Sequence, residues 1–110
     1  MNDSYTAENI VIVSRHPAAI EFVREHLAAC GVDTTKVPVI AQAGPDDVRG
    51  MDVYGNVPLH LACLAWTVWA IEFENPPRGA EYSLADMKAA GARLRSYTVR
   101  RDTEGNKEQP

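Results

Sequence analysis

The chain has 110 residues, of which 45% are hydrophobic and 24% charged, and its formal net charge is −4 at pH 7. This length predicts a single small domain, and the composition is that of an ordinary soluble globular protein. No apolar run approaches the roughly 20 residues of a membrane helix, the start lacks the pattern of a signal peptide, and the acidic balance argues against a broad surface for duplex DNA, so we expect a cytoplasmic protein.

An apolar run at residues 9–13 opens the predicted domain. It contains four consecutive β-branched residues, Ile10 to Val13, which is typical of a parallel strand buried on both faces. The polar residues 1–8 ahead of it predict a flexible leader.

A helix is predicted from Pro17 to Cys30. Proline suits the first helical turn because the N–H that it lacks would have no partner there. Apolar residues then recur at spacings of three and four, and Gly31 is placed to end the helix.

Three polar residues, Ser14, Arg15 and His16, lie between this strand and this helix. They are therefore predicted at the carboxyl end of a strand and beside a helix N-terminus. Anionic ligands bind at such places in open α/β sheets, because unpaired N–H groups and the helix dipole both favour negative charge.

The middle of the chain predicts two short strands, 37–41 and 51–54, separated by a turn at 44–47. Pro38 favours an edge position for the first of them, since proline cannot donate to a neighbouring strand.

The opening pattern then repeats as small polar residues, a proline and an apolar helix. Asn56 is a candidate N-cap, the helix is predicted to run to Trp66, and His60 would lie in its first turn.

The last third of the chain predicts one more strand and one more helix. The strand covers 68–73, a loop covers 75–79, and a capping box at Ser83 starts a helix that reaches Leu94. Residues 101–110 are polar and predict a flexible tail.

This order of elements predicts an α/β fold over residues 9–100, with helices on both faces of a mostly parallel sheet of about four strands. Right-handed crossovers would place the first and third strands side by side. A crevice would then open between their carboxyl ends, with 14–16 facing 55–60 across it.

Three segments together resemble a known family. The run from Ser14 to Glu21 reads SRHPAAIE and is similar to the signature SRHPGAIE of a small accessory family from type III CRISPR loci. Gly55 to Ala62 resembles its second block, and Ser83 to Leu94 resembles its C-terminal helix. The three segments follow one another in the order of the family and span nearly the whole predicted domain.

The resemblance implies a ring nuclease with a three-layer, Rossmann-like (CARF-like) fold. Such an enzyme cleaves the cyclic oligoadenylate second messenger of the type III response, most often cyclic tetra-adenylate, and so switches antiviral signalling off. The resemblance also implies a homodimer that needs no metal ion or other cofactor.

Site roles follow from the chemistry of this reaction. Arg15 is the candidate cation for the phosphate, because its guanidinium matches phosphate oxygens bidentately. His16 or His60 would serve as general acid or base, since an imidazole titrates near neutral pH. The remaining predicted substrate contacts are Ser14, Pro17, Gly55, Asn56 and Arg78.

Several residues have a simpler alternative. Arg15 could pair with Glu21, and His60 could be a half-buried core residue. Asn56 is expected to cap a helix first and to contact a ligand second, and His26 is expected on a solvated face. Packing is the favoured role of Trp66 and Trp69, although aromatic rings also stack on adenines. The two cysteines, Cys30 and Cys63, are expected to be buried thiols without a redox or metal role.

Other functions stay open from the sequence. The same site could sequester cyclic oligoadenylate without cleaving it. Arg15-His16 after a first strand also resembles the nucleophile motif of the histidine phosphatases, although Pro17 stands where that family has glycine. A small interaction module without any ligand is a third possibility.

Overall fold

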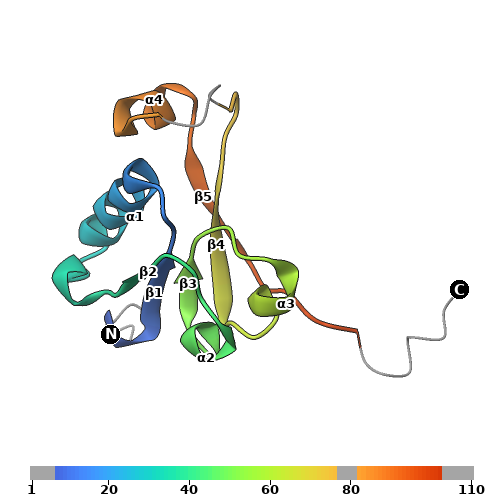
Figure 1. Cartoon of the computed structure of the whole chain (residues 1–110). Coiled ribbons are helices and arrows are strands. Elements are labelled where there is room, and N and C mark those ends of the chain that lie inside the picture. The colour runs from blue at the N-terminus through green and yellow to red at the C-terminus, as the bar shows by residue number, and fades with distance from the viewer. Residues whose placement is uncertain (1–6, 77–81, 103–110) are drawn as a thin grey trace, which may run out of the picture.

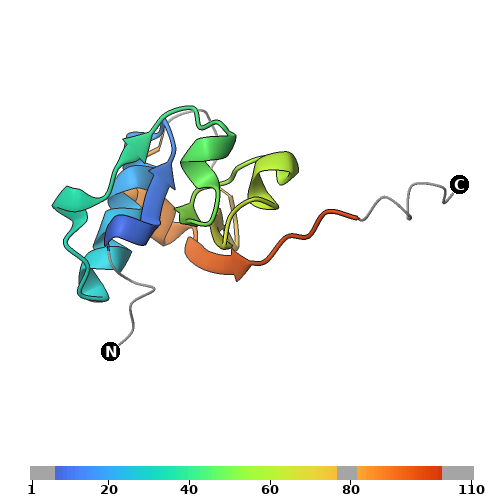
Figure 2. The ribbon, with the colours of Figure 1, turned by 90° about the horizontal axis from the view of Figure 1, so that it is seen from below.

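The computed structural model describes residues 7–76 and 82–102, which form a five-stranded sheet with helices on both faces (Figures 1 and 2). The strands are β1 (Ile10–Val13), β2 (Val39–Ile40), β3 (Asp52–Tyr54), β4 (Thr67–Glu72) and β5 (Arg93–Tyr97). The helices are α1 (Pro17–Ala29), α2 (Pro45–Val48), α3 (Leu59–Ala62) and α4 (Leu84–Ala89).

The strand order is β2-β1-β3-β4-β5. The first four strands are parallel to one another, and only β5 runs antiparallel to its neighbour β4. The predicted adjacency of β1 and β3 is confirmed, with Ile10 opposite Asp52 and Ile12 opposite Tyr54. The predictions of an α/β fold with a mostly parallel sheet, and of an edge position for β2, are confirmed as well.

The two faces of the sheet carry separate apolar cores. On one face Ile12 and Tyr54 pack with Val23 and Leu27 of α1. On the other face the core joins sheet residues to α2 and α3, and its buried members are Val11, Val48, Val53, Leu61, Ala62 and Val68. Because side chains alternate along a strand, β1 to β4 each contribute to both cores, whereas β5 contributes Leu94 to the α1 side alone. Each fully buried Val, Leu or Ile contributes about 1.5–3 kcal/mol.

Helix α1 follows the prediction closely. Pro17 occupies its first position, and it ends at Ala29 with Gly31 in a left-handed conformation at φ +88°. The N–H of Val32 bonds back to the carbonyl of Leu27 at 3.0 Å, which satisfies one of the last helical carbonyls.

The prediction of a last helix reaching Leu94 is wrong, and so is the count of about four strands. Helix α4 ends at Ala89, and Gly91 turns the chain at φ +77°, with a Cβ position 2.9 Å from the Cβ of Glu74. Residues 93–97 then pair with β4, and Leu94 packs on the α1 face of the sheet. The capping box at Ser83 is confirmed, since Ser83 and Asp86 exchange two hydrogen bonds.

The expectation of two buried thiols is also wrong. Cys30 is exposed at the C-cap of α1, and Cys63 is half-buried after the short helix α3. The predicted turn at 44–47 contains the start of α2.

The ends of the domain differ slightly from the prediction. Ala7 and Glu8, assigned to the leader, belong to a 3-10 turn, and Ala7 packs against the core. At the other end, Arg101 and Asp102 are exposed and have no regular structure, and the chain after β5 extends away from the sheet (Figure 1). Residues 1–6 and 103–110 lie outside the described residues. None of the helices in the described ranges is long and apolar enough to cross a membrane.

Candidate functional site

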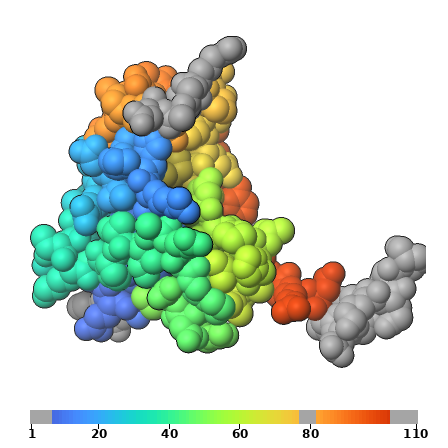
Figure 3. All heavy atoms as spheres, viewed as in Figure 1, coloured from blue at the N-terminus to red at the C-terminus, as the bar shows by residue number. Residues whose placement is uncertain are grey.

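A cavity of about 400 Å³ lies at the carboxyl ends of β1 and β3. The chain segments that meet around it are drawn blue, green and yellow-green in Figure 3. Its walls come from parts of the chain that are distant in sequence, namely 12–16, Ala19, Val23, 41–43, 54–58, Leu61, Ile71, Phe73 and Tyr82. The predicted crevice between residues 14–16 and the segment after β3 is therefore present, and it falls within the size range of small-ligand sites.

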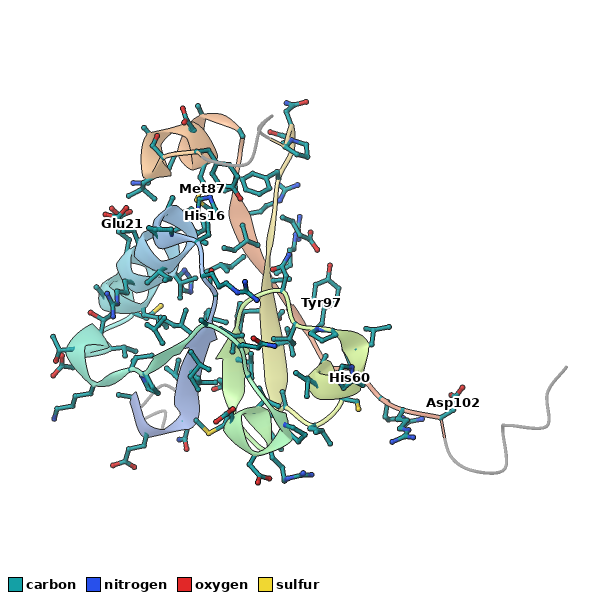
Figure 4. The ribbon with its side chains drawn as sticks, in the orientation of Figure 1. His16, Glu21, His60, Met87, Tyr97 and Asp102 are labelled. Carbon is teal, nitrogen blue, oxygen red and sulfur yellow. The ribbon has the colours of Figure 1, made fainter. Side chains whose placement is uncertain are left out.

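Arg15 is the one fully charged side chain among the described residues that line this cavity, and none of them is a carboxylate. It is exposed, and it makes no ion pair with any described residue. The alternative pairing with Glu21 is therefore not formed, and Figure 4 shows Glu21 on the outer side of α1. A guanidinium without an ion pair, in a cavity whose described lining residues include no carboxylate, favours an anionic ligand.

The start of α1 adds further donors beside Arg15. The first backbone bond of the helix runs from the N–H of Ile20 to the carbonyl of His16 at 3.0 Å. The N–H groups of Ala18 and Ala19 precede that bond and have no partner in the described part of the chain, and Ala19 lines the cavity. These free donors and the helix dipole reinforce the preference for negative charge.

Ser14 shapes the turn between β1 and α1. Its N–H donates to the carbonyl of Ile40 at 3.0 Å and so extends the pairing of β1 with β2. Its hydroxyl oxygen accepts the N–H of His16 at 3.1 Å. The serine lines the cavity as predicted, and its side chain also holds the backbone that carries Arg15 and His16.

His16 is half-buried and lines the cavity. Its ring stacks on Tyr82, with 4.2 Å between ring centroids and 25° between the ring planes. The Nδ1 atom is buried and has no hydrogen-bond partner among the described residues. Buried polar atoms are nearly always paired in proteins, so an orphaned ring nitrogen at a cavity points to a ligand or a proton-transfer role.

Tyr82 and Phe73 form an aromatic wall that the sequence analysis missed. Their rings meet edge to face, with centroids 6.0 Å apart and planes at 81°. Phe73 follows β4 and Tyr82 precedes the capping box of α4, so no local pattern joins them. The one available signal was the position of each aromatic residue at the end of a predicted element.

Gly55 brings the two sides of the cavity together. Its φ is +151°, and a Cβ atom added there would lie 2.1 Å from the carbonyl oxygen of Val13. Only glycine allows the end of β3 to approach the end of β1 so closely. Gly55 lines the cavity, and its contact with substrate stays a prediction.

Asn56 also lines the cavity, but its predicted role as a helix cap is wrong. Helix α3 starts at Leu59, and its N-cap is Pro58. The Asn56 amide instead bonds to the backbone of Ile71, accepting its N–H at 3.0 Å and donating to its carbonyl at 3.4 Å. The side chain thus replaces a peptide group and continues the contact between β3 and β4.

Two of the predicted site residues, Pro17 and His60, do not line this cavity. His60 is exposed on α3, and Figure 4 shows it well apart from His16. The alternative that His60 is a half-buried core residue is wrong, because the side chain is exposed. Pro17 is exposed at the start of α1, and Arg78 lies outside the described residues. His60 missed the cavity because α3 has only four residues and begins later than predicted.

Trp69, His26 and Trp66 lie outside the cavity and differ in how far they are buried. Trp69 stacks on Tyr54, with centroids 5.5 Å apart and planes at 3°, which confirms its packing role. His26 is not solvated as expected, because it is half-buried with its ring 6.1 Å from both of those rings. Trp66 is 69% exposed and does not line the cavity.

Comparison with known proteins gives one match. The model of the family described as "putative CRISPR-associated protein (Cas_VVA1548)" matches residues 11–100. No curated protein and no solved structure matches the chain. The matched range contains all of the described cavity-lining residues.

Proposed function

Since the chain belongs to this family of CRISPR-associated proteins, we propose that it is a metal-independent ring nuclease that cleaves cyclic oligoadenylate, with cyclic tetra-adenylate as its substrate. The proposal includes a Rossmann-like (CARF-like) fold and action in the cytoplasm, where it would switch off type III CRISPR signalling.

The observation that carries the proposal is the set of groups at the carboxyl end of β1. Three residues that line one cavity lack partners among the described residues: Arg15 has no ion pair there, and neither the Ala19 N–H nor the His16 Nδ1 has a hydrogen bond there. A cyclic oligoadenylate carries one phosphate per nucleotide, and the described lining residues offer it positive charge without a competing carboxylate.

The chemistry needs positioning and charge stabilisation. The ribose 2′ oxygen attacks the adjacent phosphorus, the bond to the 5′ oxygen breaks, and the product ends in a 2′,3′-cyclic phosphate. His16 would take the proton from the 2′-OH or deliver one to the 5′ oxygen. Arg15 and the free N–H groups would stabilise the extra negative charge of the phosphorane-like transition state.

A homodimer fits this substrate. A ring of four identical nucleotides can have two-fold symmetry, and a two-fold interface presents the same residues twice. Each cavity would then take half of the ring, and two copies of Arg15 would face one tetra-anion.

One observation favours the sequestering alternative. Cleavage by general acid and base catalysis is most efficient with two titrating groups, and His60 lies outside the cavity that contains His16. A protein with a single histidine at the site could bind the ring tightly and release it intact.

The test is incubation of the purified protein with cyclic tetra-adenylate in excess EDTA, with products identified by liquid chromatography and mass spectrometry. Linear products with cyclic phosphate ends are expected. Arg15→Ala should lower the rate by about 100-fold or more, as loss of a transition-state donor does. Arg24→Ala is the matched control, because Arg24 is an exposed arginine of α1 that does not line the cavity.

The two functions give different results. An intact ring that co-elutes with the protein would establish sequestration. Unchanged cleavage by the Arg15 variant, or an equal loss in the Arg24 variant, would contradict the site. A ring that is neither cut nor bound would reject both functions.

A further inference from the structure

A second cavity, of about 220 Å³, lies at the opposite end of the sheet. It is lined by Asn9, Gly50, Asp52 and Trp66, which precede or begin three neighbouring strands, β1, β3 and β4. We propose that this cavity binds a guanidinium group, with the Asp52 carboxylate as its counter-ion and the Trp66 indole as its stacking surface. The proposal does not depend on the function of the first cavity.

Asp52 is the reason to expect a cation. It is only 7% exposed, and it is the one buried charged residue in the described part of the chain. Its carboxylate has no hydrogen bond or ion pair with any residue in that part. Burial raises the pKa of this carboxyl because the charged form loses hydration. A buried carboxylate without a partner is costly, and a bound cation would offset that cost.

Trp66 is the reason to expect a planar cation. Its side chain is 69% exposed, which is unusual for so large an aromatic residue, and it borders the same cavity as the buried carboxylate. A guanidinium stacks on indole rings and pairs bidentately with carboxylates. It is also more weakly hydrated than an ammonium ion, so it enters a partly buried site at lower cost.

The backbone holds both sides of this cavity in place. The N–H of Trp66 donates to the carbonyl of Met51 at 2.8 Å, and the N–H of Gly50 donates to the carbonyl of Leu64 at 3.0 Å. The strand register fixes Asp52 between Ile10 and Thr67. The site is therefore formed before a ligand arrives, which lowers the entropic cost of binding.

Two sources could supply the guanidinium. One is an arginine of another molecule. The other is a second copy of this chain, because Arg100 and Arg101 are exposed and make no ion pair with the described residues. Since Tyr97 at the end of β5 pairs with Val68 near the start of β4, these arginines follow β5 at the same end of the sheet as the cavity. The recognising chemistry is the same in both cases.

The test is a titration of ¹⁵N-labelled protein with N-acetyl-arginine amide, followed by NMR at the Trp66 indole N–H and the Gly50 amide. N-acetyl-citrulline amide is the matched ligand, since it has nearly the same shape and no charge. We expect saturable shifts at both groups with the arginine probe and at least about tenfold weaker binding of the citrulline probe.

Three variants accompany the titration. Asp52→Asn keeps the side-chain volume and should weaken arginine binding by about tenfold or more. Trp66→Leu removes the indole, and the binding of the arginine probe to this variant is followed at the Gly50 amide. Asp46→Asn is the control, because Asp46 is an exposed carboxylate that does not line the cavity.

The outcomes separate the two sources. Shifts that appear on concentrating the wild-type protein alone, and that Arg100→Gln with Arg101→Gln removes, would assign the guanidinium to a second copy. Binding of the probe without such shifts would assign it to another molecule. Equal responses to citrulline, unchanged binding by Asp52→Asn, or no shift at all would overturn the proposal.

Discussion

The replacement of Gly55 by alanine tests the architecture of the main cavity. The new Cβ would lie 2.1 Å from the Val13 carbonyl oxygen, whereas an ordinary contact between carbon and oxygen is about 3.3 Å. Backbone atoms would have to separate by about 1.2 Å, and neither side of the contact is a flexible side chain.

The cost of this change has three contributions. The positive φ of +151° disfavours alanine by about 1–2 kcal/mol, and the crowding costs about 1–3 kcal/mol more. The displacement also strains the 2.9 Å bond from the Gly55 N–H to the carbonyl of Trp69, which is worth about 1 kcal/mol. Gly55→Ala should therefore lower the free energy of unfolding by about 3–6 kcal/mol, a large share of the about 5–15 kcal/mol typical of a domain.

The assay is urea unfolding followed by circular dichroism, with Gly31→Ala as the control. Gly31 has φ +88°, and no atom lies within 4 Å of its Cβ position, so this variant should lose only about 1–2 kcal/mol. The difference between the two variants isolates the contact with Val13. A difference below about 0.5 kcal/mol would refute the close approach, because that is the usual error of additivity.

Two further predictions concern single side chains. Burial holds the pKa of Asp52 above its ordinary value of 3.8, so the folded state binds the proton more tightly and its stability falls as pH rises from 3.8 through the raised pKa. Asp52→Asn should thus raise the Tm at pH 7, and this gain in Tm should shrink below pH 3.8. A lower Tm of the variant at pH 7 would contradict the reasoning. Asn56→Ala removes two hydrogen bonds to Ile71 and should lower the free energy of unfolding, measured in urea, by about 1–2 kcal/mol. Asn56→Asp should lower this free energy less. An unchanged free energy in Asn56→Ala would show that the loop holds without the two bonds.

The first third of the fold could be predicted from the sequence because its signals are local. The β-branched run of β1, the proline that starts α1 and the glycine that ends it each act on their own neighbours. The adjacency of β1 and β3 followed from the handedness of crossovers, which depends on chirality rather than on particular side chains.

The errors arose where distant contacts decide the structure. Residues 93–97 form a strand because β4 lies beside them, and Gly91 looked like a helical position until its contact with Glu74 was known. Asn56 is a residue type that often caps helices, and it precedes an apolar helical pattern. Its amide nevertheless pairs with the backbone of Ile71, which is 15 residues away. Tertiary pairing outweighed local preference in both places.

The residues of the candidate site could likewise be predicted where local signals place them, but not where distant contacts do. Ser14, Arg15 and His16 were found because a strand followed by a helix places them at the sheet edge. Tyr82 was missed because it reaches His16 from the segment before α4, more than 60 residues later. His60 was assigned to the cavity on the strength of a helix that proved to be one turn long.

The direction of β5 has a practical consequence. Because β5 runs against the other strands, the chain leaves the sheet at the end opposite the main cavity. A biotin or affinity tag joined beyond Asp102 would anchor the protein with that cavity turned toward the solution. Immobilised protein should therefore keep its access to large anionic ligands in surface-based binding measurements, whereas a tag inserted between β4 and α4 would stand beside Phe73 and Tyr82 and obstruct the cavity.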